Sequence, residues 1–200
     1  MEIPPGWEPK ELFDVEGRCL RLEESLTLFD DESIVERSAS FAATRSFDEV
    51  AASFDRTLGS PGERGFTDEA KVRSLEWSFP GGVVVTLDEE ADGSLSVSVS
   101  SHDGGTAQDI LVAVSRSPLA AIDARLTSCG VLSGVGSVRS EDGTARWHLQ
   151  GTIDDDERDR LVELLVELGY DDRGLENHFV KGDHTVVVGD YHWTAVISRS

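Results

Sequence analysis

Two eight-residue segments of this chain lie one hundred residues apart and resemble each other. Residues 75–82 and residues 175–182 share leucine, glutamate, phenylalanine and a final glycine at matching positions. Each segment follows a helix-like pattern and precedes runs of alternating apolar and polar residues, which are typical of strands. The recurrence favours an internally repeated structural unit, which constrains the architecture and leaves the chemistry open.

The first half of the chain predicts a strand, a helix and a meander of three strands. Ser46 and Glu49 have the spacing of a capping box, and apolar residues at helical spacing follow them as far as residue 58. Residues 60–65 have the composition of a flexible loop. Strands are predicted over residues 34–45, 72–79, 83–87 and 95–99, and in the last of these leucine and valine alternate with serine.

The second half predicts a similar series of elements. The apolar run 110–114 predicts a strand, and residues 117–129 carry a helical stripe that ends at Cys129. Residues 135–139 and 145–151 predict a hairpin. Residues 154–168 predict the strongest helix, because acidic residues fill its first turn and leucines share one face.

The C-terminal segment contains two glycine–aspartate pairs, Gly182-Asp183 and Gly189-Asp190, that predict two-residue hairpin turns. The first turn would place His184 opposite Lys181 and Val187 opposite His178. The second would place Val188 opposite Tyr191 and Val187 opposite His192.

Together these patterns predict an α+β fold. Antiparallel sheets are each expected to pack on one face against helices, with an internally duplicated strand-helix-meander unit. The predicted organisation is an N-terminal lead segment over residues 1–33, a first α+β half over 34–103 and a second α+β half over 104–200. Residues 102–105, which include two glycines, predict the linker between the halves.

The net charge of −21 limits the classes of partner. Lysine occurs only three times and the arginines are scattered among acidic residues, so direct binding to nucleic-acid phosphates is not expected. Three explanations for the acidity stay open: a high-salt cytoplasm, a basic protein partner, and ordinary solubility. No apolar run approaches a membrane span and the N-terminus lacks a signal-peptide pattern, so a cytoplasmic protein without membrane contact is expected.

The chain has two cysteines, Cys19 and Cys129, and neither belongs to a Cys-x-x-Cys pair. A structural zinc site or a disulfide framework is therefore not expected, and no cofactor is predicted. Because Cys129 ends a helical apolar stripe, burial as a small apolar side chain is the expected role.

Three of the five histidines, His178, His184 and His192, lie within fifteen residues. In the predicted register His178 and His192 flank Val187 on one sheet face, too far apart for simple zinc ligation, and His184 points to the opposite face. Exposed strand histidines are the simplest interpretation. The alternative is a pH-sensitive docking surface, for which the candidate residues are His178, Val187, His192 and Thr194.

No nucleophile elbow, phosphate-binding loop or metalloprotease motif occurs in the sequence, and no catalytic residue is predicted. The leading hypothesis is a non-enzymatic acidic binding or adaptor protein, either chaperone-like or a neutralising partner of a basic protein. One alternative is a small enzyme or a metal or ligand binder that uses the histidine-bearing C-terminal sheet. Another is a nucleic-acid mimic.

Overall fold

The computed structural model describes residues 16–29, 32–59, 71–103, 106–174 and 177–199. Four sequence predictions fall at least partly outside these described residues. They concern the start of the lead segment (1–15), the loop 60–65, the linker glycines Gly104 and Gly105, and the repeat residues Leu175 and Glu176.

The chain divides into two compact units. The first unit comprises residues 1–24 and 34–103, and the second comprises residues 25–33 and 104–200. The predicted boundaries at residues 33 and 103 are not themselves tested by this division and stay a prediction.

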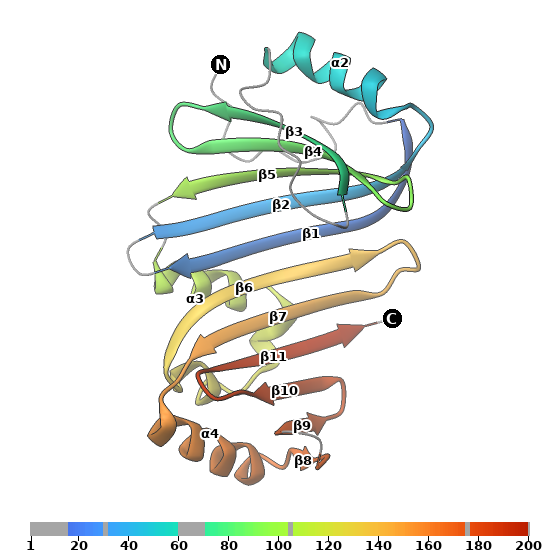
Figure 1. The fold of residues 1–200 in the computed structure, drawn as a ribbon. Coiled ribbons are helices and arrows are strands. Elements are labelled where there is room, and N and C mark those ends of the chain that lie inside the picture. The colour runs from blue at the N-terminus through green and yellow to red at the C-terminus, as the bar shows by residue number, and fades with distance from the viewer. Residues whose placement is uncertain (1–15, 30–31, 60–70, 104–105, 175–176, 200) are drawn as a thin grey trace. The chain divides into compact units, whose positions relative to one another are not determined.

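The first unit contains one described helix, three whole strands and most of two others (Figure 1). Residues 25–29 of the first strand and 32–33 of the second belong to the second unit. In chain order these elements are β1 Gly17–Phe29, β2 Glu32–Ala43, α2 Phe47–Leu58, β3 Lys71–Phe79, β4 Val83–Glu90 and β5 Leu95–Asp103.

The predicted capping box at the start of α2 is confirmed. The Ser46 hydroxyl accepts a hydrogen bond from the backbone N–H of Glu49, and the Glu49 carboxylate accepts one from the backbone N–H of Ser46 at 2.9 Å. The buried residues of the helix are Phe47, Val50, Ala51 and Phe54.

The second unit contains two α-helices, two short 3-10 helices and six strands. In chain order these are α3 Ala107–Ser115, η1 Pro118–Ala121, η2 Leu126–Ser128, β6 Val131–Ser140, β7 Ala145–Thr152, α4 Asp155–Glu167, β8 Asp171–Asp172, β9 His178–Lys181, β10 His184–Val188 and β11 His192–Arg199. The helix predicted over residues 154–168 is therefore confirmed as α4, and Asp154 and Glu157 form its capping box.

The predicted fold class, an α+β protein with separate antiparallel sheets each covered by helices, is wrong. The structure consists mainly of one large antiparallel sheet of eleven strands, accompanied by three described α-helices. The strand order is β3-β4-β5-β2-β1-β6-β7-β11-β10-β9-β8.

The error arises largely at β1, which the sequence analysis left in a lead segment. Glu23, Glu24 and Ser25 interrupt the apolar alternation there, but the strand continues through them for thirteen residues. Glu24 forms an ion pair with Arg37 on β2, with 3.4 Å between Oε1 and Nε. A cross-strand partner of this kind lets an acidic residue lie within a strand.

The same succession of elements occurs in each unit. A hairpin, a helix and a three-strand meander appear as β1-β2-α2-β3-β4-β5 in the first unit and as β6-β7-α4-β9-β10-β11 in the second. The pairing orders also correspond, because each meander lies beside the second strand of its hairpin. The described parts of the two similar sequence segments lie at the first strand of each meander and the turn that follows it.

Two predictions between β5 and β6 are wrong. Residues 110–114 are not a strand but part of α3, which begins after Thr106 with an Asp109 capping box. Ile110 and Val114 are one turn apart and buried, so the apolar run is a helix face. The stripe over residues 117–129 is not one helix but two separate 3-10 turns, η1 and η2, which bury Leu119 and Leu126.

Each unit has its own hydrophobic core. The core of the first unit consists of Ala39, Phe41, Phe47, Val50, Ala51, Phe54, Trp77, Val85, Leu87, Leu95 and Val97. The core of the second unit includes Ile110, Leu126, Leu149, Leu161, Leu165, Phe179, Val186, Trp193 and Ile197. In the strands these residues alternate with less buried ones, so each meander has a core face and an opposite face.

None of the described helices is both long enough and apolar enough to span a membrane.

Candidate functional site

The face of the second unit opposite its core is formed by β9, β10, β11, β7 and β6. Residues paired directly across antiparallel strands point to the same side of the sheet, so the register defines this face. We call it the histidine face, and it consists of His178, Val180, Thr185, Val187, His192, Thr194, Val196, Ser198, Arg146, His148, Gln150, Thr152, Val131, Gly134, Gly136 and Val138. Its side chains are half-buried or exposed, whereas Phe179, Val186 and Trp193 on the other side of the same strands are buried.

The four residues predicted to form a binding surface, His178, Val187, His192 and Thr194, lie on the histidine face. Val187 is directly opposite both His178 on β9 and Thr194 on β11. The predicted turn at Gly182-Asp183 is confirmed by the pairing of His184 with Lys181. Gly182 has a φ of 63°, which suits the first central position of a type II′ turn.

The predicted turn at Gly189-Asp190 is wrong. Val188 pairs with Trp193 and not with Tyr191, so four residues separate the paired positions. The Gly189 N–H donates to the His192 carbonyl at 2.7 Å, and a Cβ added at Gly189 would lie 2.9 Å from Cε1 of the His192 ring. His192 therefore lies next to Thr152 of β7 and not next to Val187.

This register moves His178 and His192 further apart than predicted. They are two strands and one side-chain row apart, which corresponds to about 12 Å along the sheet. Across the described residues, no group of three or more histidine, cysteine, aspartate or glutamate side chains is placed to hold a metal ion.

The histidine face contains no aspartate or glutamate, although the chain has 39 acidic residues. Its ionisable side chains are Arg146, His148, His178 and His192. The nearest carboxylate in register is Asp171 on β8, opposite Val180 at the rim. One exposed apolar side chain, Val131, lies at one end of the face and is 66% exposed.

The corresponding face of the first unit has different chemistry. It lies opposite Trp77, Val85 and Val97 on β3, β4 and β5. We call it the serine face, and it consists of Ser74, Glu76, Ser78, Val84, Thr86, Asp88, Glu90, Ser96, Ser98 and Ser100. The charged residues among these ten are carboxylates. Lys71 is paired with Glu90 at the β-bulge in β3, and His102 lies at the other end of the face.

Asp88 is the most buried polar group of the serine face. It is directly opposite Ser74 on β3 and Ser96 on β5, and only 5% of its surface is exposed. The Ser74 hydroxyl donates a hydrogen bond of 2.6 Å to its carboxylate. Glu76, in the next row, accepts a hydrogen bond of 2.9 Å from the Ser78 hydroxyl. These short side chains form a polar surface with carboxylates held in place by serines.

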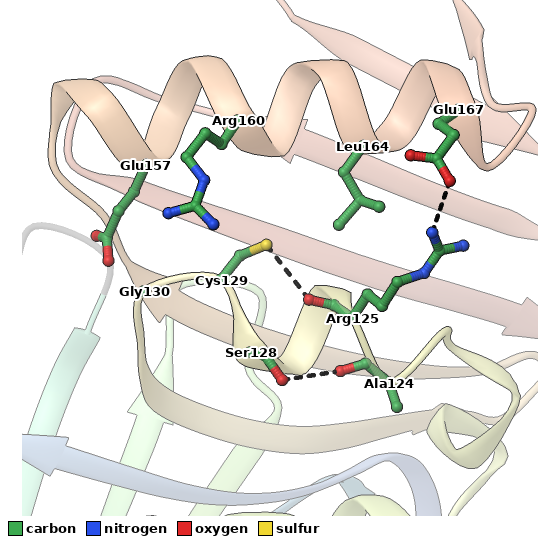
Figure 2. Close-up of a pocket in the computed structure, with 9 residues that line it drawn as sticks. All are labelled: Ala124, Arg125, Ser128, Cys129, Gly130, Glu157, Arg160, Leu164 and Glu167. Carbon is green, nitrogen blue, oxygen red and sulfur yellow. Dashed lines mark hydrogen bonds and ion pairs between the residues drawn. The ribbon is translucent and has the colours of Figure 1, made fainter.

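The second unit also contains a pocket of about 520 Å³ between α4 and the segment from η2 to β6 (Figure 2). The lining residues are Ala124, Arg125, Ser128, Cys129, Gly130, Glu157, Arg160, Leu164 and Glu167. Figure 2 shows Arg160 extending from α4 toward the sulfur of Cys129.

One end of the pocket is closed by ion pairs. Arg125 Nη1 lies 2.7 Å from Glu167 Oε1 on α4, and Arg125 Nε lies 3.1 Å from Asp123 Oδ1. The hydrogen bonds from Arg125 lower the pKa of the Asp123 carboxyl, and those to Asp123 and Glu167 raise the pKa of the guanidinium. The charges at this end of the pocket are thus already engaged with one another.

The thiol of Cys129 is poorly suited to act as a nucleophile. Burial raises its pKa, and this outweighs the opposing effect of Arg160. The thiol donates to the Arg125 carbonyl at 3.3 Å, and the Cys129 carbonyl accepts a hydrogen bond from the Trp193 indole at 3.1 Å. Cys129 is half-buried, so its predicted burial holds only in part.

Two glycines allow this packing around Cys129. Gly130 has a φ of 70°, and a Cβ there would lie 2.0 Å from the Thr152 carbonyl oxygen. A Cβ at Gly151 would lie 2.4 Å from Nε1 of Trp193. The indole therefore lies directly over Gly151, which fixes the position of its hydrogen bond to Cys129.

No protein-family model, curated protein or solved structure shows significant similarity to this chain. The interpretation of the surfaces therefore depends on their own chemistry.

Most residues of both faces were not predicted from the sequence. Arg146, His148 and Gln150 alternate with Trp147 and Leu149, and this pattern could have placed them on an outward face. Only two acidic residues, Asp183 and Asp190, occur between residues 177 and 199, both in turns. That local lack of acid was the available signal for the histidine face.

Proposed function

We propose that this protein is a non-enzymatic binding protein for a basic partner protein, and that the serine face of the first unit is the binding surface. The observation that carries the proposal is the composition of this face. Short hydroxyl side chains surround Glu76, Asp88 and Glu90, which are the charged groups described on it. This arrangement suits lysine and arginine side chains on a partner that lies flat against the sheet.

Small side chains contribute to this fit. Serines at positions 96, 98 and 100 on β5 and 74 and 78 on β3 leave the backbone of a partner room to approach closely. Their hydroxyls can both donate and accept hydrogen bonds, so they can satisfy polar groups that the partner would bury. The carboxylate of Glu76 accepts a hydrogen bond from Ser78 and loses little further freedom when a cation binds.

The overall charge of −21 adds a long-range contribution. A negative field accelerates encounters with a basic protein and weakens with added salt. This general attraction would operate on any part of the surface. A decisive experiment must therefore compare the serine face with another acidic surface of the same chain.

The test uses fluorescein-labelled twelve-residue peptides of alternating Lys and Thr, with Glu–Thr and Ser–Thr peptides as charge controls. Binding is measured by fluorescence anisotropy at about 0.15 M salt, where charges more than about 8 Å apart are largely screened. The double variant Glu76→Gln/Glu90→Gln is compared with Asp159→Asn/Glu163→Gln, which removes two exposed charges from α4.

We expect the Lys–Thr peptide to bind and the serine-face variant to weaken it by about 2- to 30-fold, from about 0.2–1 kcal/mol for each exposed ion pair. The α4 variant should keep nearly full affinity. Equal losses in the two variants would mean that attraction is general and that the serine face is not the site. Preferential binding of the Glu–Thr peptide would contradict the proposal entirely.

A further inference from the structure

We infer that the histidine face of the second unit binds a second copy of this chain, so that the protein forms a symmetric dimer. This surface is separate from the serine face, and the inference does not depend on the proposed function. It starts from the contrast between a chain with 39 acidic residues and a five-strand face that has none.

The missing carboxylates indicate what kind of partner the face can accept. A surface that contacts a basic partner has no reason to lack carboxylates. A surface that contacts an acidic partner does, because like charges brought together at an interface cost several kcal/mol. A second copy of this chain is an acidic partner whose charge, −21, is known.

The side chains of the face have the character of a protein interface. Val187 and Val196 lie near its centre beside Thr185 and Thr194, and Val180 lies on the edge strand β9; all five are half-buried in the single chain. The cores of protein interfaces are depleted in charged residues and enriched in apolar and aromatic ones. Val131, which is largely exposed, extends the apolar surface at one end.

The size of the face is also appropriate. Five strands at about 4.8 Å spacing span about 20–24 Å, and three to four side-chain rows extend for a similar length, giving about 500 Å² in projection. The accessible area of protruding side chains exceeds the projected area. The face therefore approaches the roughly 800 Å² that each partner contributes to a standard interface.

A twofold axis parallel to the strands, between β10 and β11, would satisfy this geometry. It would set the apolar centre of one copy against that of the other, with Val187 over Thr194 and Thr185 over Val196. Two sheets would then pack face to face at about 10 Å, as in a β-sandwich. The same axis sets β8 over β6, so Asp171 would lie at the edge of the interface opposite Gly136, which has no side chain.

Salt concentration separates this interaction from binding to a basic partner. Two copies of charge −21 repel one another, so added salt screens the repulsion and should strengthen the dimer. The affinity for a basic peptide should instead fall with salt. The two interactions therefore fail or succeed independently, and their salt responses have opposite signs.

The test is sedimentation velocity of the full chain from about 1 to 200 µM, at low salt and at about 1 M salt, where the Debye length is about 3 Å. Val187→Glu and Gln150→Glu each place a carboxylate on the histidine face. Gln150 is already exposed, so its variant is expected to fold normally. Val166→Glu is the control, because Val166 is 60% exposed on α4 and the substitution adds the same charge.

We expect a monomer–dimer equilibrium that shifts toward dimer at high salt. Val187→Glu should raise the dissociation constant at least about tenfold, because each dimer would bury two added carboxylates against Thr194 of the other copy. Gln150→Glu should weaken the dimer less, because the proposed axis sets Gln150 over His178 of the other copy. Val166→Glu should behave like the wild type. A chain that stays monomeric under all conditions, or a dimer that face and control variants weaken equally, would overturn the inference.

Discussion

The contact between Trp193 and Gly151 allows a sharp test of how the second unit is packed. Trp193 is completely buried, and its indole nitrogen would lie 2.4 Å from a Cβ at position 151, with Cε2 at 2.7 Å. Gly151→Ala therefore forces a rigid ring out of a filled core. Overpacking of this kind costs typically about 1–3 kcal/mol. Displacing the ring would also lengthen its hydrogen bond to the Cys129 carbonyl, which contributes about 1 kcal/mol more.

Gly134→Ala is the matched control on the neighbouring strand. Its added Cβ would meet Gln150 Oε1 at 3.3 Å, and that atom is the mobile end of an exposed side chain. We expect this variant to lie within about 1 kcal/mol of the wild type, because alanine also restricts the unfolded chain. The glycine pair thus separates steric conflict from the general effect of a methyl group on a strand.

The assay is urea unfolding followed by circular dichroism and by tryptophan fluorescence. Gly151→Ala should lower the free energy of unfolding by about 2–4 kcal/mol, the sum of the packing and hydrogen-bond contributions. Trp193→Phe should partly relieve the conflict, so the double variant should lose less than the sum of the single losses. Equal stability of Gly151→Ala and Gly134→Ala would refute the placement of the indole over Gly151.

Two further predictions concern the pocket between α4 and η2. Hydrogen bonds with Arg125 lower the pKa of Asp123 in the folded protein. The stability that this carboxylate contributes is therefore fully present above about pH 4, the ordinary pKa of an unfolded aspartate. It is lost as the pH falls through the lower pKa of the folded state. Asp123→Asn should therefore be less stable than the wild type at pH 7 and equally stable in acid. Urea unfolding from pH 2 to 7 measures this, and a constant stability difference between the two proteins over that range would contradict the prediction. Burial raises the pKa of Cys129. In a Cys19→Ser background, iodoacetamide at pH 7.5 should therefore modify the Cys129 thiol more slowly than it modifies a small free thiol. An equal or faster rate would show that the thiol is activated.

Local signals in the sequence were sufficient for several elements. The capping boxes at Ser46 and Asp154 fix two helix starts through hydrogen bonds between residues three apart. Likewise the pairing of His178 with Val187 follows from a two-residue turn at Gly182. Each of these features is decided by neighbouring residues, so it can be inferred without knowledge of the rest of the fold.

Features that depend on distant partners were not predictable in this way. β1 remains a strand through Glu23 and Glu24 partly because Arg37 on β2 is available to pair with Glu24. The loop before β11 is longer than predicted because the His192 ring and carbonyl both contact Gly189. Residues 110–114 contain only apolar side chains, and such a run fits a buried strand and a helix face equally well.

The two units share a succession of elements and a pairing order, yet their outward faces have opposite chemistry. In the first unit the positions between core residues hold serine, threonine and carboxylates. In the second they hold histidine, valine, threonine, glutamine, serine and one arginine. Folding requires only that the side chains on these outward faces can be exposed to water. It does not explain why one face carries carboxylates and the other does not. The two proposals assign these faces to two different partners, one basic and one acidic. A single titration with salt can distinguish them, because screening weakens attraction between opposite charges and relieves repulsion between like charges.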